Sequence, residues 1–291
     1  MKTCNFCDAW GSSAYPDLQN QSLGEQIAES RKRVLSRINC ARFLVYFQAY
    51  TTTFARVVEL RKHIEIALAE PNVVGVVIGT RPDCISDALI ELLRETSQKA
   101  YVAIEYGVQS FDENQLVWMR RGHTAARSIK AIERTREQLP QVQIGIHLIL
   151  GLPDERDGDL IKAAEISNGL PIDDVKLHNL HVLVNTPLAD DFASGRFTPV
   201  SLEEYARRVT IYLQHLRPGM YVHRLAALSS RHEELVAPKW TARKMESYQF
   251  ILDYMRAQGA FQGQLYRERL GITESKCCEG KNETRIDVVS L

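Results

Sequence analysis

Apolar and polar positions follow two patterns along this chain, and these patterns alternate between residues 24 and 225. Short continuous apolar runs predict buried strands at 43–50, 73–79, 101–108, 142–150, 175–183 and 221–225. Apolar residues at helical spacing predict helices at 24–38, 55–69, 86–97, 112–119, 124–138, 158–169 and 201–215. Apolar strands separated by helices are typical of a parallel sheet covered on both faces. The pattern leaves open whether this sheet stays open or closes partly into a barrel.

Polar side chains gather at the carboxyl ends of the predicted strands. They belong to Gln48, Tyr50, Thr80, Arg81, Asp83, Glu105, Gln109, Glu155, His178 and His181. Parallel α/β proteins bind their ligands at this edge of the sheet. Glu105, His147 and Lys176 lie inside apolar strands, where an unpaired charge is costly, so we expect them to face a polar cavity.

The chain of 291 residues carries 36 basic and 36 acidic residues, so its formal net charge is zero. This balance argues against a dedicated duplex-binding protein, which needs a strongly basic face, although it is compatible with a local basic patch. No apolar run is long enough to span a membrane, and the first ten residues lack the apolar segment of a signal peptide. We therefore expect a cytoplasmic protein with no membrane partner, whose six cysteines are thiols or metal ligands.

Cys4 and Cys7 form a Cys-x2-Cys pair near the start of the sequence. Such a pair ligates zinc, forms a redox dithiol or supplies part of an iron–sulfur site. A zinc site needs two further ligands, and the adjacent Cys277 and Cys278 make a poor second pair. A redox dithiol normally follows a strand and opens a helix, whereas three residues precede Cys4. Taken alone, the pair also fits two uninvolved thiols.

A set of short motifs, which follow one another over residues 4–240, favours the iron–sulfur interpretation of the cysteine pair. They are CNFC at 4–7, YFQAYTTTF at 46–54, GTRPDC at 79–84, EYGVQS at 105–110, RRGH at 120–123, HLILGLPDE at 147–155, KLHNLHVL at 176–183 and HRLAA at 223–227. In this order they resemble the YhcC-type branch of the radical S-adenosylmethionine (SAM) superfamily. That branch is related to oxygen-independent coproporphyrinogen III oxidase and to the catalytic subunit of Elongator.

The resemblance implies an α/β fold of three parts: an incomplete parallel, TIM-barrel-like (β/α) barrel over residues 1–230, a helical extension over 231–270 and a flexible tail over 271–291. In this superfamily three cysteines hold a 4Fe–4S cluster, and SAM chelates the fourth iron. An electron from a donor such as flavodoxin or ferredoxin cleaves SAM to a 5′-deoxyadenosyl radical, which acts on the substrate. Related members act on tRNA or on porphyrinogens, so a small molecule and an RNA both remain open as substrates.

The same resemblance implies a set of site residues. The metal ligands would be Cys4 and Cys7, and the cofactor-binding residues Phe6, Gln48, Tyr50, Glu105, Gln109, Arg121 and His147. Phe6 would pack on the cofactor, and the segment 47–51 would bind the SAM amino group through its backbone carbonyls. Gln109 and Arg121 match positions that contact the ribose and carboxylate of SAM, and an Arg fork suits a carboxylate. His147 stands where related enzymes carry an aspartate, and residues 149–153 resemble a segment that cradles adenine.

The sequence departs from the branch before Cys4. A first barrel strand and a glycine-rich loop with another cluster cysteine precede the Cys-x2-Cys pair in the branch, whereas only Met1, Lys2 and Thr3 precede it here. We therefore expect the first strand and the third ligand to be missing. Cys40 and Cys84 are poor substitutes, because they lie in or beside predicted strands. Three interpretations stay open: a truncated radical SAM enzyme, a degenerate non-catalytic relic or binding scaffold, and a zinc or redox protein.

Overall fold

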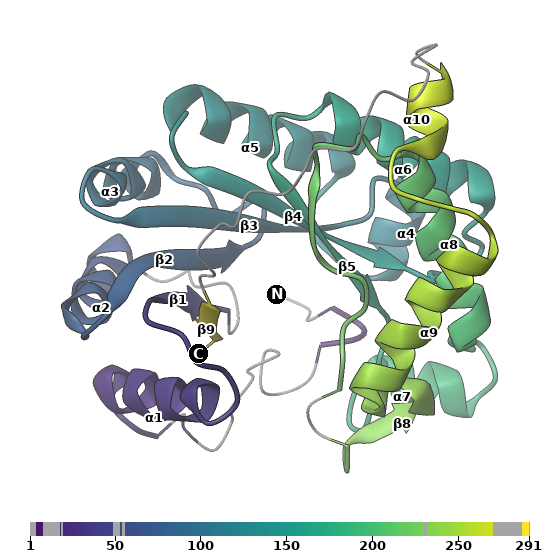
Figure 1. Cartoon of the computed structure of the whole chain (residues 1–291), viewed down its shortest axis with the longest axis horizontal. Helices are drawn as coiled ribbons and strands as arrows, with labels where there is room; N and C mark the ends of the chain where they lie inside the picture. The colour runs from purple at the N-terminus through teal and green to yellow at the C-terminus, as the bar shows by residue number, and fades with distance from the viewer. Residues whose placement is uncertain are drawn as a thin grey trace. The chain divides into compact units, whose positions relative to one another are not determined.

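The structure of the protein is a computed structural model, which describes residues 4–7, 18, 20–48, 53, 56–229, 232–269 and 287–290. Its strands are β1 (Phe43–Phe47), β2 (Val73–Thr80), β3 (Tyr101–Gln109), β4 (Gln143–Leu150), β5 (Asp174–Asn179), β6 (Val182–Leu183), β7 (Tyr221–Arg224), β8 (Leu235–Ala237) and β9 (Asp287–Ser290). Seven strands follow the order β7-β5-β4-β3-β2-β1-β9 in one sheet, and β6 pairs with β8 in a second (Figure 1).

The helices alternate with the strands of the large sheet. They are α1 (Leu23–Leu35), α2 (Val57–Ala69), α3 (Asp87–Ser97), α4 (Glu113–Trp118), α5 (Ala125–Gln138), α6 (Asp157–Gly169), α7 (Pro187–Ala193), α8 (Leu202–His215), α9 (Lys244–Ala257) and α10 (Gln264–Arg269), with a 3₁₀ turn at Lys239–Ala242. None of these helices is both long enough and apolar enough to cross a membrane.

The chain divides into two compact units. The β1–β3 unit consists of Trp10–Gly107, Ala131–Ile144 and Ser275–Leu291. The β4–β7 unit consists of Met1–Ala9, Val108–Lys130 and Gly145–Glu274. Most of the candidate site residues belong to the β4–β7 unit.

In the β1–β3 unit, parallel pairing lines up apolar β-branched side chains. Val45 of β1 lies beside Val76 of β2, and Ile78 of β2 lies beside Ile104 of β3. All four are completely buried. β-branched residues pack well on a pleated surface, and full burial explains why these strands have continuous apolar sequences.

Two helices of this unit begin at serines that cap them. Ser22 and Glu25 form a capping box at α1, in which each side chain accepts a hydrogen bond from the other's backbone N–H. The Ser86 hydroxyl accepts a hydrogen bond from the Leu89 N–H at the start of α3. Such caps typically contribute about 1 kcal/mol each, because they satisfy N–H groups that have no partner within the helix.

In the β4–β7 unit, β5 pairs in parallel with both β4 and β7. Leu148 of β4 lies beside Leu177 of β5, and both side chains are buried. The Tyr212 hydroxyl of α8 donates a hydrogen bond of 3.0 Å to Ser167 of α6, which ties these two helices together. Helix α9 packs on α8 in turn, as Figure 1 shows in green and yellow.

The parallel strands and intervening helices confirm the predicted α/β class. The strand expected over 175–183 differs, because it breaks after Asn179 and resumes as β6. Residues 182 and 183 leave the large sheet and pair antiparallel with β8, which lies more than fifty positions later in the chain. A local sequence pattern could not predict this partner, because β6 and β8 lie far apart in the chain.

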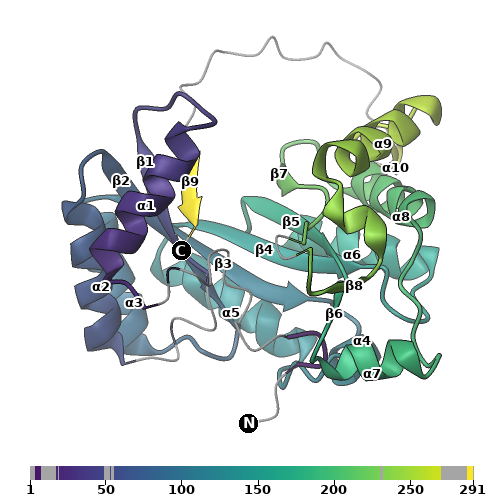
Figure 2. The same cartoon turned by 90° about the horizontal axis from the view of Figure 1, so that it is seen from below.

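Four residues of the tail form a strand. Strand β9 pairs in parallel with β1, with Phe43 beside Asp287 and Tyr46 beside Ser290 (Figure 2). The edge of a strand presents unpaired N–H and C=O groups that template another strand, so β9 covers this edge of β1. Cys277 and Cys278 lie outside the described residues.

Candidate functional site

The two cysteines of the CNFC motif lie on a tight turn of the β4–β7 unit. The Cys7 N–H donates a hydrogen bond of 3.2 Å to the Cys4 carbonyl, which closes the turn. Cys4 is buried, Cys7 and Phe6 are half-buried, and neither cysteine is in a disulfide. The turn therefore holds two thiols close together in the chain, one of them at the protein surface.

Asn5 fixes this turn to the rest of the unit. Its N–H and its side-chain Nδ2 donate to the carbonyls of Met119 and Trp118, at 3.2 and 2.9 Å. Its own carbonyl accepts a hydrogen bond of 2.9 Å from the Leu188 N–H at α7. Asn5 is only 2% exposed. A buried residue with these bonds restricts the turn between the cysteines to one position relative to α4 and α7.

Arg121 brings a positive charge to the first cysteine. Its Nη1 atom lies 3.2 Å from Cys4 Sγ, and both side chains are buried. The Arg121 N–H donates to the Leu116 carbonyl, while Arg120 and Gly122 on either side adopt φ angles of 56° and 72°. A guanidinium beside a sulfur stabilises the thiolate, which is the form that binds metal ions.

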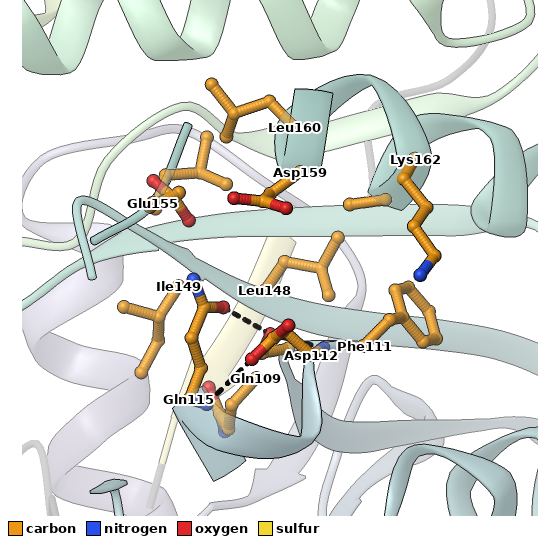
Figure 3. Close-up of a pocket in the computed structure, with 13 residues that line it drawn as sticks. Gln109, Phe111, Asp112, Gln115, Leu148, Ile149, Glu155, Asp159, Leu160 and Lys162 are labelled. Carbon is orange, nitrogen blue, oxygen red and sulfur yellow. Dashed lines mark hydrogen bonds between the residues drawn. The ribbon is translucent and has the colours of Figure 1, made fainter. Parts of the chain in front are cut away.

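Gln109 ends β3 in a left-handed conformation, with a φ of 70°. A residue other than glycine rarely adopts this conformation, and such strain is often retained at functional positions. Gln109 lines a pocket at the carboxyl ends of β3 and β4. The pocket is lined by Gln109, Ser110, Phe111, Asp112, Gln115, Leu148, Ile149, Leu150, Glu155, Asp159, Leu160, Lys162 and Ala163. Figure 3 shows Lys162 extending toward Phe111, and Asp159 between Glu155 and Lys162.

Glu155 anchors the loop that follows β4. Its carboxylate accepts hydrogen bonds from the Gly151 N–H at 2.8 Å and from Arg208 of α8 at 2.7 Å. Burial raises the pKa of Glu155, whereas these two donors act in the opposite direction. Gly151 has a φ of 89°, and Asp154 a φ of 56°. The buried ion pair therefore stabilises the sharp turn of residues 149–153, which the sequence relates to adenine binding.

His147 stands on β4 beside a second histidine. The ring of His147 stacks on His178 of β5, with the ring centroids 4.9 Å apart. Arg224 of β7 reaches the same ring, with Nη2 2.9 Å from His178 Nδ1. Burial lowers the pKa of His178 well below its usual value, and the nearby positive charge of Arg224 lowers it further.

The structure places the predicted site residues in both units. Cys4, Phe6, Cys7, Gln109, Arg121 and His147 belong to the β4–β7 unit. Gln48 and Glu105 belong to the β1–β3 unit, where Glu105 of β3 is buried directly beside Gly79 of β2. Tyr50 lies outside the described residues. Sequence reasoning missed Asn5 and assigned no role to Arg224, because only the folded chain shows what these side chains contact.

An iron–sulfur cluster is held by thiolate ligands, which the cysteine turn can supply in part. Among the described residues, no group of three or more His, Cys, Asp or Glu side chains is arranged to hold a metal ion. Two soft sulfur donors beside a guanidinium fit two of the three thiolate positions of a 4Fe–4S cluster.

Comparisons with known proteins bear on the same site. The Radical SAM superfamily model matches residues 1–165, and the Radical_SAM C-terminal domain model matches residues 172–257. Protein YhcC of Escherichia coli (strain K12) is 33% identical over 272 residues, which cover 93% of this chain and 86% of the relative. Protein YtqA of Bacillus subtilis (strain 168) is 29% identical over 264 residues, 91% of this chain and 81% of the relative.

A solved structure supports the fold. The archaeal Methanocaldococcus infernus Elp3 with an N-terminal deletion matches with a TM-score of 0.69 and 17% identity, and covers 84% of this chain. This chain spans 63% of that structure's length. The likeness confirms the predicted incomplete parallel (β/α) barrel, and the sequence matches confirm the predicted relation to YhcC. This chain belongs to the radical SAM superfamily.

Proposed function

We propose that this protein binds a 4Fe–4S cluster through Cys4 and Cys7 and cleaves SAM to a 5′-deoxyadenosyl radical. The observation that carries the proposal is the CNFC turn, which Asn5 holds in place and at which Arg121 approaches the Cys4 sulfur at 3.2 Å. When bound, the cluster supplies the electron that cleaves the sulfonium of SAM. The residues of the chain bind and orient the cofactors and exclude water from them.

Arg121 has a second role in this proposal. Its guanidinium stabilises the Cys4 thiolate, and its fork of N–H donors also suits the SAM carboxylate. Gln109 and residues 149–153 would hold the adenosine part, which is supported by the left-handed conformation of Gln109 at the end of β3 and by the hydrogen bond from the Gly151 N–H to Glu155. Phe6 would pack on the bound cofactors and His147 would contact the ribose.

The remaining predicted residues complete this proposal. Gln48 and Tyr50 lie in the segment that would bind the SAM amino group through backbone carbonyls, and Glu105 would accept hydrogen bonds from the ribose. We further propose a cytoplasmic protein with flavodoxin or ferredoxin as electron donor, and a catalytic barrel over residues 1–230 followed by the helical extension over 231–270. The substrate would be a small molecule or an RNA.

Anaerobic reconstitution of the full chain with iron and sulfide tests the proposal. Iron, acid-labile sulfide and zinc are measured, and 5′-deoxyadenosine is quantified after a chemical reductant and SAM are added. We expect iron, sulfide and product in the wild type, and loss of all three in Cys4→Ala and Cys7→Ala. Cys40→Ala and Cys84→Ala are matched controls, because each removes one half-buried thiol elsewhere and is expected to keep the cluster.

The outcomes separate the three interpretations. Equal amounts of product from Cys7→Ala and the wild type would falsify the cluster assignment. Zinc without sulfide supports the zinc or redox alternative. A folded wild type with neither metal nor product supports the non-catalytic relic or binding scaffold. If the wild type does hold a cluster, a combined Cys277→Ala and Cys278→Ala variant tests whether the tail supplies the third thiolate.

A further inference from the structure

Helix α8 holds the turn of residues 149–153 through an ion pair. Arg208 of α8 donates to Glu155 at 2.7 Å and to the Leu152 carbonyl at 3.4 Å. Glu155 in turn accepts a hydrogen bond of 2.8 Å from the Gly151 N–H. The side chains of Arg208 and Glu155 are only 12% and 4% exposed. This first support therefore reaches the backbone of Gly151 through one buried carboxylate.

A second carboxylate restrains Arg208 within α8. The Nε atom of Arg208 donates to Glu204 at 2.8 Å. Arg207 donates to the other oxygen of Glu204 and to the Asp157 carboxylate of α6, each at 2.8 Å. Two guanidinium groups thus alternate with three carboxylates from α6 to Glu155. Because such charge-assisted bonds hold Arg208 at both ends, it forms a rigid link between α8 and the turn.

Val200, which precedes α8, packs against the same glycine. A Cβ atom at Gly151 would lie 2.8 Å from Val200 Cγ2, closer than carbon atoms approach one another in folded proteins. Gly151 also has a φ of 89°, a conformation that favours glycine. The Val200 methyl group therefore occupies the space that a side chain at position 151 would fill, and it limits the movement of the turn in that direction.

Trp240 of the helical extension holds Val200 in place. Its Nε1 atom donates to the Val200 carbonyl at 3.2 Å, and its ring lies against Tyr205 of α8 with the ring centroids 5.3 Å apart. Val200 and Tyr205 flank the first turn of α8, at two positions where apolar side chains commonly fix how a chain enters a helix. The Ser247 hydroxyl of α9 donates to the Trp240 carbonyl at 2.7 Å. Trp240 therefore joins the entry of α8 to the helical extension.

We propose that Trp240 is a positioning residue for SAM, which holds Val200 against Gly151 and so fixes the turn of residues 149–153 for the adenosine part. Trp240 acts through Val200 rather than by contact with the cofactor, and Arg208 acts on the same turn through Glu155. The proposal rests on the proposed function, which assigns residues 149–153 to adenosine. Because two supports meet at Gly151, the loss of one should weaken adenosine binding without abolishing it.

The test measures how tightly the full chain binds S-adenosylhomocysteine, by isothermal titration calorimetry without cluster, reductant or turnover. This ligand has the adenosine part of SAM but no sulfonium to cleave. Trp240→Phe keeps a ring against Tyr205 and removes the Nε1–H donor, so we expect the affinity to fall about threefold. Trp240→Ala removes the ring as well and displaces the turn further, so we expect a loss of about tenfold or more.

Hydrogen exchange of the Gly151 amide reports on the turn without any ligand. The Glu155 carboxylate accepts a hydrogen bond from this N–H, so a loosened turn should exchange it faster. We expect faster exchange in Trp240→Ala and in Val200→Ala than in the wild type. The double variant should lose no more affinity than Trp240→Ala alone, because both residues act through one contact.

Met255→Ala is the matched control for a general loss of stability, since it truncates a buried side chain elsewhere in α9. It should lower the free energy of unfolding but leave the ligand affinity and the Gly151 exchange as in the wild type. In the enzyme loaded with cluster, Trp240→Ala should raise the KM for SAM more than it lowers kcat, because adenosine binding is what it disturbs.

Two results overturn the proposal: wild-type affinity in both Trp240→Ala and Val200→Ala, or an equal loss of affinity in Met255→Ala. If the wild type does not bind S-adenosylhomocysteine but Trp240→Ala speeds Gly151 exchange, the adenosine site of the proposed function is wrong while the support of the turn stands. If the wild type cleaves SAM and Gly151 exchange is the same in Trp240→Ala, the positioning role alone is wrong.

Discussion

His181 makes the stability of the β4–β7 unit sensitive to mild acid. Burial of its ring, together with the nearby Arg224, lowers the pKa of His181 from 6.5 to about 4. The hydrogen bond to the backbone of Ala227 acts in the opposite direction and raises this pKa. Between these two values the unfolded chain takes up a proton at His181, whereas the folded chain does not. The stabilisation is therefore present above pH 6.5 and is lost as the pH falls toward 4.

The size of the effect follows from the two pKa values. The pKa of His181 is 6.5 in the unfolded chain and about 4 in the folded chain. Because one pKa unit corresponds to about 1.4 kcal/mol, His181 can change the free energy of unfolding by at most about 3 kcal/mol. Between about pH 7 and about pH 5, the expected loss in the free energy of unfolding is about 2 kcal/mol. His178 adds to the loss with the same sign, because its pKa is also lowered by burial.

Urea unfolding followed by circular dichroism measures this dependence. The free energy of unfolding is compared at the two pH values in the wild type, in His181→Gln and in His232→Gln, whose side chain is exposed before β8. We expect the loss on acidification to be about 2 kcal/mol smaller in His181→Gln than in the wild type, and unchanged in His232→Gln. The same loss in all three proteins would show that His181 is not held neutral, and the reasoning would fail.

Two further predictions concern contacts that hold the site together. Asn5→Ala removes the hydrogen bond to the Trp118 carbonyl and should lower the free energy of unfolding, measured with urea, by about 1–3 kcal/mol. An unchanged urea midpoint would argue against Asn5 as the anchor of the CNFC turn. Arg208→Met leaves the buried Glu155 carboxylate without its cation and should cost about 3–5 kcal/mol by the same assay. Adding Glu155→Gln should recover part of that loss, and a double variant less stable than Arg208→Met would contradict the ion-pair argument.

Local patterns were sufficient for most of the strands and helices between residues 24 and 225. Continuous apolar runs such as 43–50 and 142–150 became β1 and β4, because strands buried on both faces need apolar side chains at every position. The pairing of β6 with β8, and of β9 with β1, was not predicted. Short strands such as β6 and β9 form where another strand offers an edge with which to pair, and that other strand lies in a distant part of the sequence.

The candidate site divides in the same way. The short motifs and their order were enough to indicate membership of the radical SAM superfamily. The same motifs led us to predict cysteine ligands for a cluster and an arginine for a carboxylate, because each of these depends on a few neighbouring residues. Only the tertiary structure decided that Arg121 lies against Cys4, that Asn5 holds the turn between the cysteines, and that Lys176 lies beside Arg224. The physical reason is that hydrogen bonds and charges act over a few ångströms, and residues far apart in the sequence come that close only after the chain has folded.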